Sequence, residues 1–307
     1  MSTALLKAAG ATVAVGGACF AWGLVEAGLY TVRRFDLDIL PPGGTSIRVL
    51  HVSDLHLRAG QERKLAFVRS LAELEPDLVV NTGDNITEPG AIAPLLAAMD
   101  GLRSLPGVFV FGSNDYYAPR SGNPLKYLIR RRRPGITYNT NGRDELPWDQ
   151  LRDGLEGCGW EDLTHRRATL EVNGYRIAFR GTDDAHLSRD EYSLVAGPAD
   201  PTADLNIGVT HAPYLRVIDA MAADGMDLIL AGHTHGGQVC VPFYGALATN
   251  CDLDARRVKG MSSHSAGGHT AHMHVSAGLG TSPYSPYRFA CRPEVTLLTL
   301  RPRLHTA

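Results

Sequence analysis

The 307-residue chain lacks a charge excess of either sign, a closely spaced cysteine pair and an internal repeat. Its formal net charge is −2, whereas general nucleic-acid binders are usually basic, so we expect no nucleic-acid partner. The five cysteines are scattered, odd in number and never arranged as CxxC, so the sequence predicts no disulfide framework and mildly favours a reducing compartment. Apolar residues make up 44% of the chain, which is enough for a full globular core.

One charge-free stretch departs from this ordinary composition. Residues 8–25 carry no charged side chain and have the length of a helix that crosses a hydrocarbon layer of about 30 Å. We therefore predict an N-terminal hydrophobic helix within residues 1–35. This helix would act as a single-pass membrane anchor, and the flanking charges do not determine its orientation. The alternatives are an export signal or a docked helix. The protein would then be exported or cytoplasmic. Residues 36–45, with two prolines and two glycines, are interpreted as a linker to a domain in 46–302.

From residue 46 onward, short apolar strands alternate with helical patterns. The strand patterns before residue 112 are 46–53, 78–80 and 107–111, and the helical patterns between them are 62–74 and 92–103. This alternation predicts an α/β sheet. Further along, Asn173-Gly174 between two alternating runs predicts a hairpin. Later strands are predicted at 205–209, 228–230 and 294–300, with a helix at 214–223.

Two polar regions each allow two interpretations. Residues 118–147 are rich in Pro, Arg, Asn and Gly and are predicted to be a loop insertion. Its basic run, Arg130 to Arg133, would be a solvated face or a contact for anionic lipid or substrate phosphate. The second region contains His264, His269, His272 and His274, and is interpreted as a polar loop, with a further metal-binding tract as the alternative.

Ligand-type side chains follow five of the predicted strands. Each group alone has an ordinary explanation, such as a helix cap, a turn residue or a buried histidine. The carboxyl ends of strands in an open α/β sheet line one crevice, so we expect these groups to meet. They are Asp54 and His56; Asp84; Ser113, Asn114 and Asp115; His211; and His233 and His235.

This set of side chains predicts a metal centre. Carboxylate, imidazole and amide groups without a thiolate suit Mn, Fe, Zn or Co better than Mg or Ca, which favour shells of oxygen alone. The set is too large for one tetrahedral ion and suits two divalent ions that share a bridging carboxylate. The glycines next to these groups, Gly83 and Gly232, let the backbone approach the ions closely.

In chain order, these blocks resemble the calcineurin-like metallophosphoesterase superfamily, and most of all its bacterial membrane-associated branch. The blocks are DxH at 54–56, GDN at 83–85, Gly112 to Asp115, the histidine of THAP at 211 and GHTHGGQ at 232–238. The resemblance implies a four-layer α/β/β/α sandwich of two mixed sheets flanked by helices. It also implies that one ion is held by Asp54, His56 and His235, that Asp84 bridges, and that the second ion is held by Asn114, His211 and His233.

The third block departs from the family pattern. The family has Gly-Asn-His followed by an acidic residue, whereas this chain has Gly112-Ser113-Asn114-Asp115. An ungapped match places Ser113 at the metal-ligand position and Asn114 at the position of the histidine that helps to protonate the leaving group. We expect Asn114 to be the ligand because an amide oxygen is the better donor, with Ser113 as the alternative. Either way, the usual acid histidine is missing.

These observations predict a binuclear metal-dependent phosphatase or phosphodiesterase. A hydroxide bridging the two ions would attack phosphorus in line, with Asp84, Asn114 and His211 as catalytic residues. The predicted anchor suggests a lipid-linked or cell-envelope phosphate ester. The alternatives are a degenerate metal-binding membrane protein that senses or scaffolds, and a soluble nucleotide phosphodiesterase. Arg288, predicted near the site mouth with Tyr284 and Tyr287, would pair with a substrate phosphate or serve a structural role. The oligomeric state is not predicted.

Overall fold

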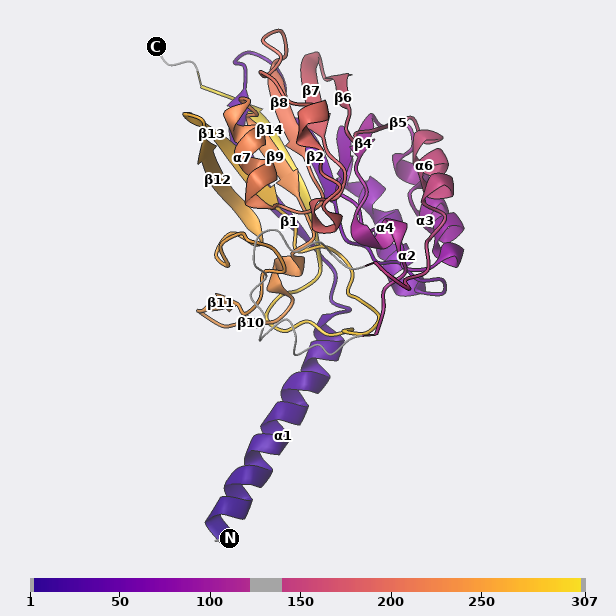
Figure 1. Ribbon diagram of the computed structural model, residues 1–307, viewed down its shortest axis with the longest axis vertical. Coiled ribbons are helices and arrows are strands. Elements are labelled where there is room, and N and C mark those ends of the chain that lie inside the picture. The colour runs from indigo at the N-terminus through magenta and orange to yellow at the C-terminus, as the bar shows by residue number, and fades with distance from the viewer. Residues whose placement is uncertain (1–2, 122–139, 305–307) are drawn as a thin grey trace.

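The computed structural model describes residues 3–121 and 140–304 (Figure 1). Its centre consists of two six-stranded sheets. The first sheet has the spatial order β1 (Thr31–Leu40), β14 (Glu294–Pro302), β2 (Ile47–Val52), β3 (Leu78–Asn81), β4 (Gly107–Phe109) and β5 (Trp160–Asp162). The second has the order β12 (Gly260–Ala266), β13 (His269–Val275), β9 (Leu228–Ala231), β8 (Leu205–Val209), β7 (Tyr175–Gly181) and β6 (Arg167–Val172).

Both sheets are mixed. In the first, β2 to β5 are parallel neighbours, and β14 runs antiparallel to β2 but parallel to β1. In the second, β7, β8, β9 and β13 are parallel, and the edge strands β6 and β12 are antiparallel to their neighbours. The parallel strands of each sheet therefore end at one common edge, which is where a site built from strand ends must lie.

Helices cover the outer faces of the two sheets. The helices α2 (Glu62–Ser70), α3 (Ile92–Ala98) and α6 (Trp148–Glu156) pack on the first sheet through one apolar cluster, and α7 (Leu215–Ala223) packs on the second through another. A third cluster fills the space between the sheets and joins Val80 and Val108 to Ile207 and Leu228. The layers seen in Figure 1 confirm the predicted four-layer α/β/β/α sandwich.

Two hairpins form the outer strands of the second sheet. Asn173 and Gly174 both have positive φ, 51° and 83°, as a type I′ turn requires, and the hairpin predicted there is confirmed. The polar loop predicted around His264 to His274 is wrong, because β12 and β13 pair along their full lengths. Within the described parts of the chain, the four histidines of this hairpin belong to no cluster of metal-ligand side chains.

Part of the predicted linker belongs to the first sheet. Residues 36–40 form the second half of β1, where they pair with β14. Their alternation of apolar and acidic side chains is a strand pattern, and only residues 41–45, with the prolines and glycines, are irregular. In the predicted insertion at 118–147, the basic run Arg130 to Arg133 lies outside the described residues.

The predicted single-pass membrane anchor is wrong. Residues 3–26 do form one helix, α1 (Thr3–Glu26), which projects from the body of the protein (Figure 1). Within 3–121 and 140–304, however, no helix combines the length and the apolar character that a membrane crossing needs. The physical reason is composition, because α1 is rich in Ala and Gly, which contribute little apolar surface per residue.

The last turn of α1 is joined to the rest of the protein. The Glu26 carboxylate accepts hydrogen bonds from the backbone N–H groups of Ala290 (3.1 Å) and Cys291 (2.7 Å). The backbone N–H of Arg288 donates to the carbonyl of Gly23 at 2.9 Å, and Phe20 contacts the ring of Tyr287. The docked-helix alternative therefore describes the end of α1.

Candidate metal centre

The predicted ligand groups lie where the parallel strands end. Asp54 and His56 follow β2, Asp84 follows β3, and His211 follows β8. The third block forms α4 (Ser113–Tyr116) after β4, and His233 and His235 follow β9. Asp54, Asp84 and His211 are almost fully buried, so the groups meet below the surface at the edge shared by both sheets.

Two clusters of potential ligands share one carboxylate. Asp54, His56 and His235 form the first cluster, and Asp54, Asp84 and His211 form the second. The Nε2 atoms of His56 and His235 are 3.0 Å apart, and Asp54 Oδ1 lies 3.5 Å from His235 Nε2. Asp84 Oδ2 lies 3.4 Å from His56 Nε2 and 3.6 Å from His211 Nε2, so Asp84 stands between imidazoles of both clusters.

Backbone carbonyls fix the orientation of two imidazoles. Nδ1 of His211 lies 2.7 Å from the carbonyl oxygen of Thr82, and Nδ1 of His235 lies 3.2 Å from that of Gly280. A proton on His211 Nδ1 donates to the Thr82 carbonyl and leaves the Nε2 lone pair facing the clusters, which is the usual arrangement behind a metal-ligating histidine. Nδ1 of His235 also lies 3.3 Å from Arg288 Nη2.

Three buried polar atoms of the cluster residues have no hydrogen-bond partner among the described residues. Asp54 Oδ1 and His211 Nε2 face the clusters, and His56 Nδ1 is a third such atom; all three belong to buried residues. A buried polar atom normally has a partner, because leaving it unpaired costs about 1–3 kcal/mol. The donor types and the two orphaned atoms that face the clusters therefore fit divalent cations.

The electrostatics of the clusters favour a cation. Burial raises the pKa of Asp54 to about 6, and the Asp84 carboxylate adds to the rise. Burial would also raise the pKa of Asp84, but His211, His56 and hydrogen bonds from Asn114 hold it below its usual value. Burial opposes protonation of His211, yet the carboxylates of Asp84, Asp184 and Asp54 raise its pKa to about 9. These carboxylates thus attract positive charge to the centre of the site.

Asn114 contacts Asp84 through both its backbone and its side chain. Its backbone N–H donates to Asp84 Oδ1 and its Nδ2 donates to Asp84 Oδ2, each at 2.7 Å. A guanidinium can only donate, and Arg143 Nη2 lies 3.2 Å from Asn114 Oδ1, so Arg143 holds the amide with its nitrogen towards Asp84. The neighbouring Ser113 hydroxyl makes a longer contact, with its Oγ 3.5 Å from Asn114 Nδ2.

His233 stands apart from the two clusters. Its ring centroid is 5.2 Å from that of His211, and its backbone N–H donates to Asp54 Oδ2 at 2.9 Å. Its Nε2 lies 3.3 Å from the carbonyl oxygen of Asn250. The structure thus places His233 beside the second cluster, with its Nε2 directed towards the 250 loop.

Arg288 is buried under the glycine-rich corner. Its guanidinium donates to the carbonyls of Ala277 and Gly280, both at 2.7 Å, and of Gly278 at 3.0 Å. It also approaches the carbonyl of His235 at 3.4 Å. Because Arg288 is fully buried and surrounded by carbonyl oxygens, the structure favours the structural role over contact with a substrate phosphate.

Two further polar residues, which no sequence motif indicates, follow a sixth strand. Strand β7 is followed by Asp184 and His186, which are both buried. Burial raises the pKa of Asp184 to about 7, and the His186 ring lies 4.3 Å from that of His233. The same strand-end rule would have found them. Asp115 was noted without a role; its carboxylate accepts from the backbone N–H groups of Asp84 (2.8 Å) and Asn85 (2.7 Å) and so joins the second and third blocks.

The fold and this cluster define a metallophosphoesterase-type α/β sandwich. Residues 47–237 match the Calcineurin-like phosphoesterase family, and the chain belongs to this family.

Two bacterial relatives are similar to this chain over nearly their whole lengths. The uncharacterized metallophosphoesterase YkuE of Bacillus subtilis (strain 168) is 28% identical, over 96% of this chain and 93% of that protein. Phosphodiesterase YaeI of Escherichia coli (strain K12) is 24% identical, over 96% of this chain and 97% of that protein. Among solved structures, TT1561 of Thermus thermophilus matches with a TM-score of 0.41 and 14% identity, over 76% of this chain and 91% of that one.

Proposed function

We propose that this chain is a phosphoester hydrolase whose centre holds two divalent cations. The observation that carries the proposal is the pair of buried clusters that share Asp54, with Asp54 Oδ1 and His211 Nε2 lacking hydrogen-bond partners among the described residues. Membership of the calcineurin-like phosphoesterase family supports the same chemistry. Bound cations would neutralise charge on the phosphate oxygens and lower the pKa of a coordinated water.

The proposed ligands are those of the sequence analysis. Asp54, His56 and His235 would hold the first cation, and Asp84, between His56 and His211, would bridge. His211 would hold the second cation through Nε2, together with Asn114 and His233. The set of imidazole, carboxylate and amide donors favours Mn, Fe, Zn or Co.

The chain's own side chains would orient the substrate. Asn114 and Arg143 lie on the side of Asp84 where the family pattern has a histidine, and neither group releases a proton near neutral pH. They would instead hold phosphate or leaving-group oxygens by hydrogen bonds. Without the acid histidine, the leaving group must either have a low pKa and depart without a proton, or take its proton from water.

Replacing Asn114 with Ala is expected to weaken binding of the second cation by about 10–100-fold and to lower kcat/KM. Ligation by Oδ1 requires the amide to turn over and to give up its contact with Arg143, so this ligand is the weakest of the set. Titration with Mn²⁺ or Zn²⁺, followed by calorimetry, measures the change. The matched control is Ser113→Ala, which alters the neighbouring residue of the same block and should leave metal binding near parental.

Two results would reassign this position. If Ser113→Ala loses the cation and Asn114→Ala keeps it, Ser113 is the ligand. If Asn114→Ala keeps both cations but loses activity, Asn114 acts only through its amide N–H groups.

The substrate proposed is a phosphodiester with a good leaving group. The Escherichia coli relative is named a phosphodiesterase, which makes this class the first to test. The lipid-linked or envelope ester expected from the sequence depended on a membrane anchor, and that basis is lost because no described helix can span a membrane. Cyclic nucleotides remain in the test panel as the nucleotide alternative.

Full-length protein loaded with Mn²⁺ is expected to hydrolyse bis(p-nitrophenyl) phosphate, and the activity should disappear on chelation and return on readdition of metal. Release of nitrophenolate measures the rate, and p-nitrophenyl phosphate and cyclic nucleotides complete the panel.

A second candidate function is a metal-binding protein without turnover. It is favoured by the Gly-Ser-Asn-Asp block and by the contact that holds the Asn114 amide against Arg143. Binding of two cations without hydrolysis of any substrate would decide for that candidate.

A further inference from the structure

Two cysteine thiols lie directly behind the glycine-rich corner that carries His235. Cys240 belongs to the short strand β10 (Cys240–Val241), and Cys291 precedes β14. The Sγ atom of Cys240 lies 3.3 Å from the carbonyl oxygen of Gly236. The Sγ atom of Cys291 lies 3.4 Å from the carbonyl of His235 and 3.5 Å from that of Gly236. Both S–H groups are thus directed at one turn.

The two thiols are also neighbours of each other. Both sulfur atoms lie within 3.5 Å of the same Gly236 carbonyl oxygen, and both residues belong to one small apolar cluster. The two chain segments run side by side, because the Cys240 N–H donates to the carbonyl of Phe289 at 2.8 Å and Val239 pairs with Phe289. This backbone pairing keeps the sulfur atoms together without a covalent bond.

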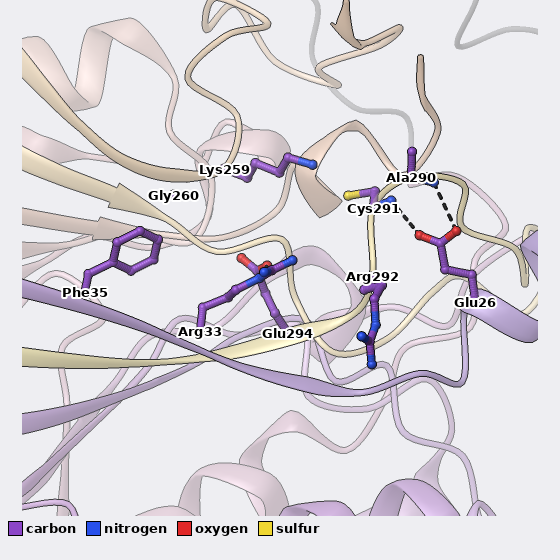
Figure 2. A pocket seen from close by; sticks show the side chains of 9 residues that line it. All are labelled: Glu26, Arg33, Phe35, Lys259, Gly260, Ala290, Cys291, Arg292 and Glu294. Atoms are coloured by element: carbon purple, nitrogen blue, oxygen red, sulfur yellow. Dashed lines mark hydrogen bonds and ion pairs between the residues drawn. The ribbon is translucent and has the colours of Figure 1, made fainter. Parts of the chain in front are cut away.

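A cavity of about 430 Å³ opens next to this thiol pair, and Cys291 forms part of its wall. Figure 2 shows the Cys291 sulfur on the same side of the cavity as the Lys259 amine, with Glu294 and Arg33 below them. Lys259 Nζ lies 3.8 Å from Cys240 Sγ. The volume is large enough for a small solute, which would meet Cys291 in the cavity wall.

Cationic side chains surround the cavity. Arg33, Lys259 and Arg292 line it together with the carboxylates of Glu26 and Glu294. Glu26 accepts from the backbone of Ala290 and Cys291, and Glu294 pairs with Arg33 at 3.2 Å. The three cations outnumber the two carboxylates, and a positively charged environment is the kind in which cysteines react.

We propose that Cys240 and Cys291 are an oxidation site that forms a reversible disulfide on reaction with a hydroperoxide. The Cys291 sulfur attacks one peroxide oxygen, the O–O bond breaks, and a sulfenic acid and water form. The Cys240 sulfur then attacks the sulfenic sulfur, the S–S bond forms and a second water leaves. In sum, two thiols and hydrogen peroxide give one disulfide and two waters, and the two electrons lost by the thiols reduce the peroxide.

Oxidation would loosen the corner that carries His235. A disulfide has no S–H group, so the hydrogen bonds from Cys240 and Cys291 to the carbonyls of His235 and Gly236 would be lost. The His235 ring faces Asp54 from this turn. This consequence rests on the proposed function, and we expect lower metal retention and activity in the oxidised protein; formation of the disulfide does not depend on that function.

The test uses the full-length reduced protein and hydrogen peroxide. Free thiols should fall from five to three, and a non-reducing peptide map should contain one peptide that joins Cys240 to Cys291. Dithiothreitol should restore five thiols. The matched control is Cys158→Ser, which removes a buried cysteine elsewhere and should still form the linked peptide. The Cys240→Ser/Cys291→Ser variant keeps hydroxyl donors to the turn, and its activity should survive peroxide.

Three results would overturn the proposal. The first is five free thiols after treatment with peroxide. The second is oxidation of Cys291 to sulfinic acid without a linked peptide. The third is a disulfide that joins two chains. If the double serine variant loses activity as fast as the parent, the loss comes from the metals rather than the thiols, and the proposed effect on the corner is wrong even where the linked peptide forms.

Discussion

Replacing Asp84 with Asn is expected to remove bound metal and to lower kcat/KM by at least about 10³-fold, which corresponds to several kcal/mol of lost transition-state stabilisation. Asp84 Oδ2 lies between His56 Nε2 and His211 Nε2, so one carboxylate serves both proposed cation positions. Asparagine keeps the shape but lacks the negative charge. Its NH₂ group would also oppose the NH₂ of Asn114, which now donates to Asp84 Oδ2.

Two measurements check this prediction together. Elemental analysis of the purified protein gives the metal content, and initial rates with bis(p-nitrophenyl) phosphate give kcat/KM. Asp162→Asn is the matched control, because Asp162 is equally buried but pairs with Arg152 away from the centre. An Asp84→Asn protein that keeps both metals and parental turnover would refute the assignment of the centre.

Replacing Arg288 with Met is expected to lower the free energy of unfolding by about 3–5 kcal/mol. Methionine fills a similar volume but donates no hydrogen bond. The carbonyls of Ala277, Gly278 and Gly280 would then be buried without their guanidinium partner. The same loops support His235, because its Nδ1 lies 3.2 Å from the Gly280 carbonyl, so metal retention should fall as well.

The urea midpoint of unfolding measures this effect. Arg301→Met is the control, because Arg301 pairs with Asp36 and Asp38 on the surface, where ion pairs contribute about 0–1 kcal/mol. Arg288→Lys keeps the charge but loses the planar set of donors, and its midpoint should fall between those of the parent and Arg288→Met. If Arg288→Met unfolded at the parental midpoint and only raised KM, Arg288 would be a substrate contact instead.

The position of the candidate site could be predicted because it follows from strand direction. Parallel strands end at one edge, so Asp54, Asp84 and His211 meet there whatever the details of the loops. Asp184 and His186 obey the same rule, and they were missed because no motif draws attention to them. The orientation of the Asn114 amide could not be predicted, since it depends on Arg143, which is 29 residues away and reaches it only through the fold.

Composition misled the prediction at the N-terminus in two ways. Length and absence of charge favoured a membrane span for residues 8–25, but many small side chains make α1 too weakly apolar. Next to it, the prolines and glycines of 41–44 favoured a linker over the whole of 36–45, whereas the alternating pattern of 35–39 forms part of β1. Burial of Arg288 was also invisible, because a local sequence does not show how many carbonyls surround a side chain.

The place of β14 in the first sheet has a consequence for how the chain folds. This strand, formed by residues 294–302, lies between β1 and β2 and pairs with both. While a ribosome is still making the protein, β1 therefore has no neighbour to pair with until residues 294–302 emerge. Contacts this distant in sequence form slowly. The first sheet therefore keeps an open edge at β2 until β14 has been synthesised and can pair with it.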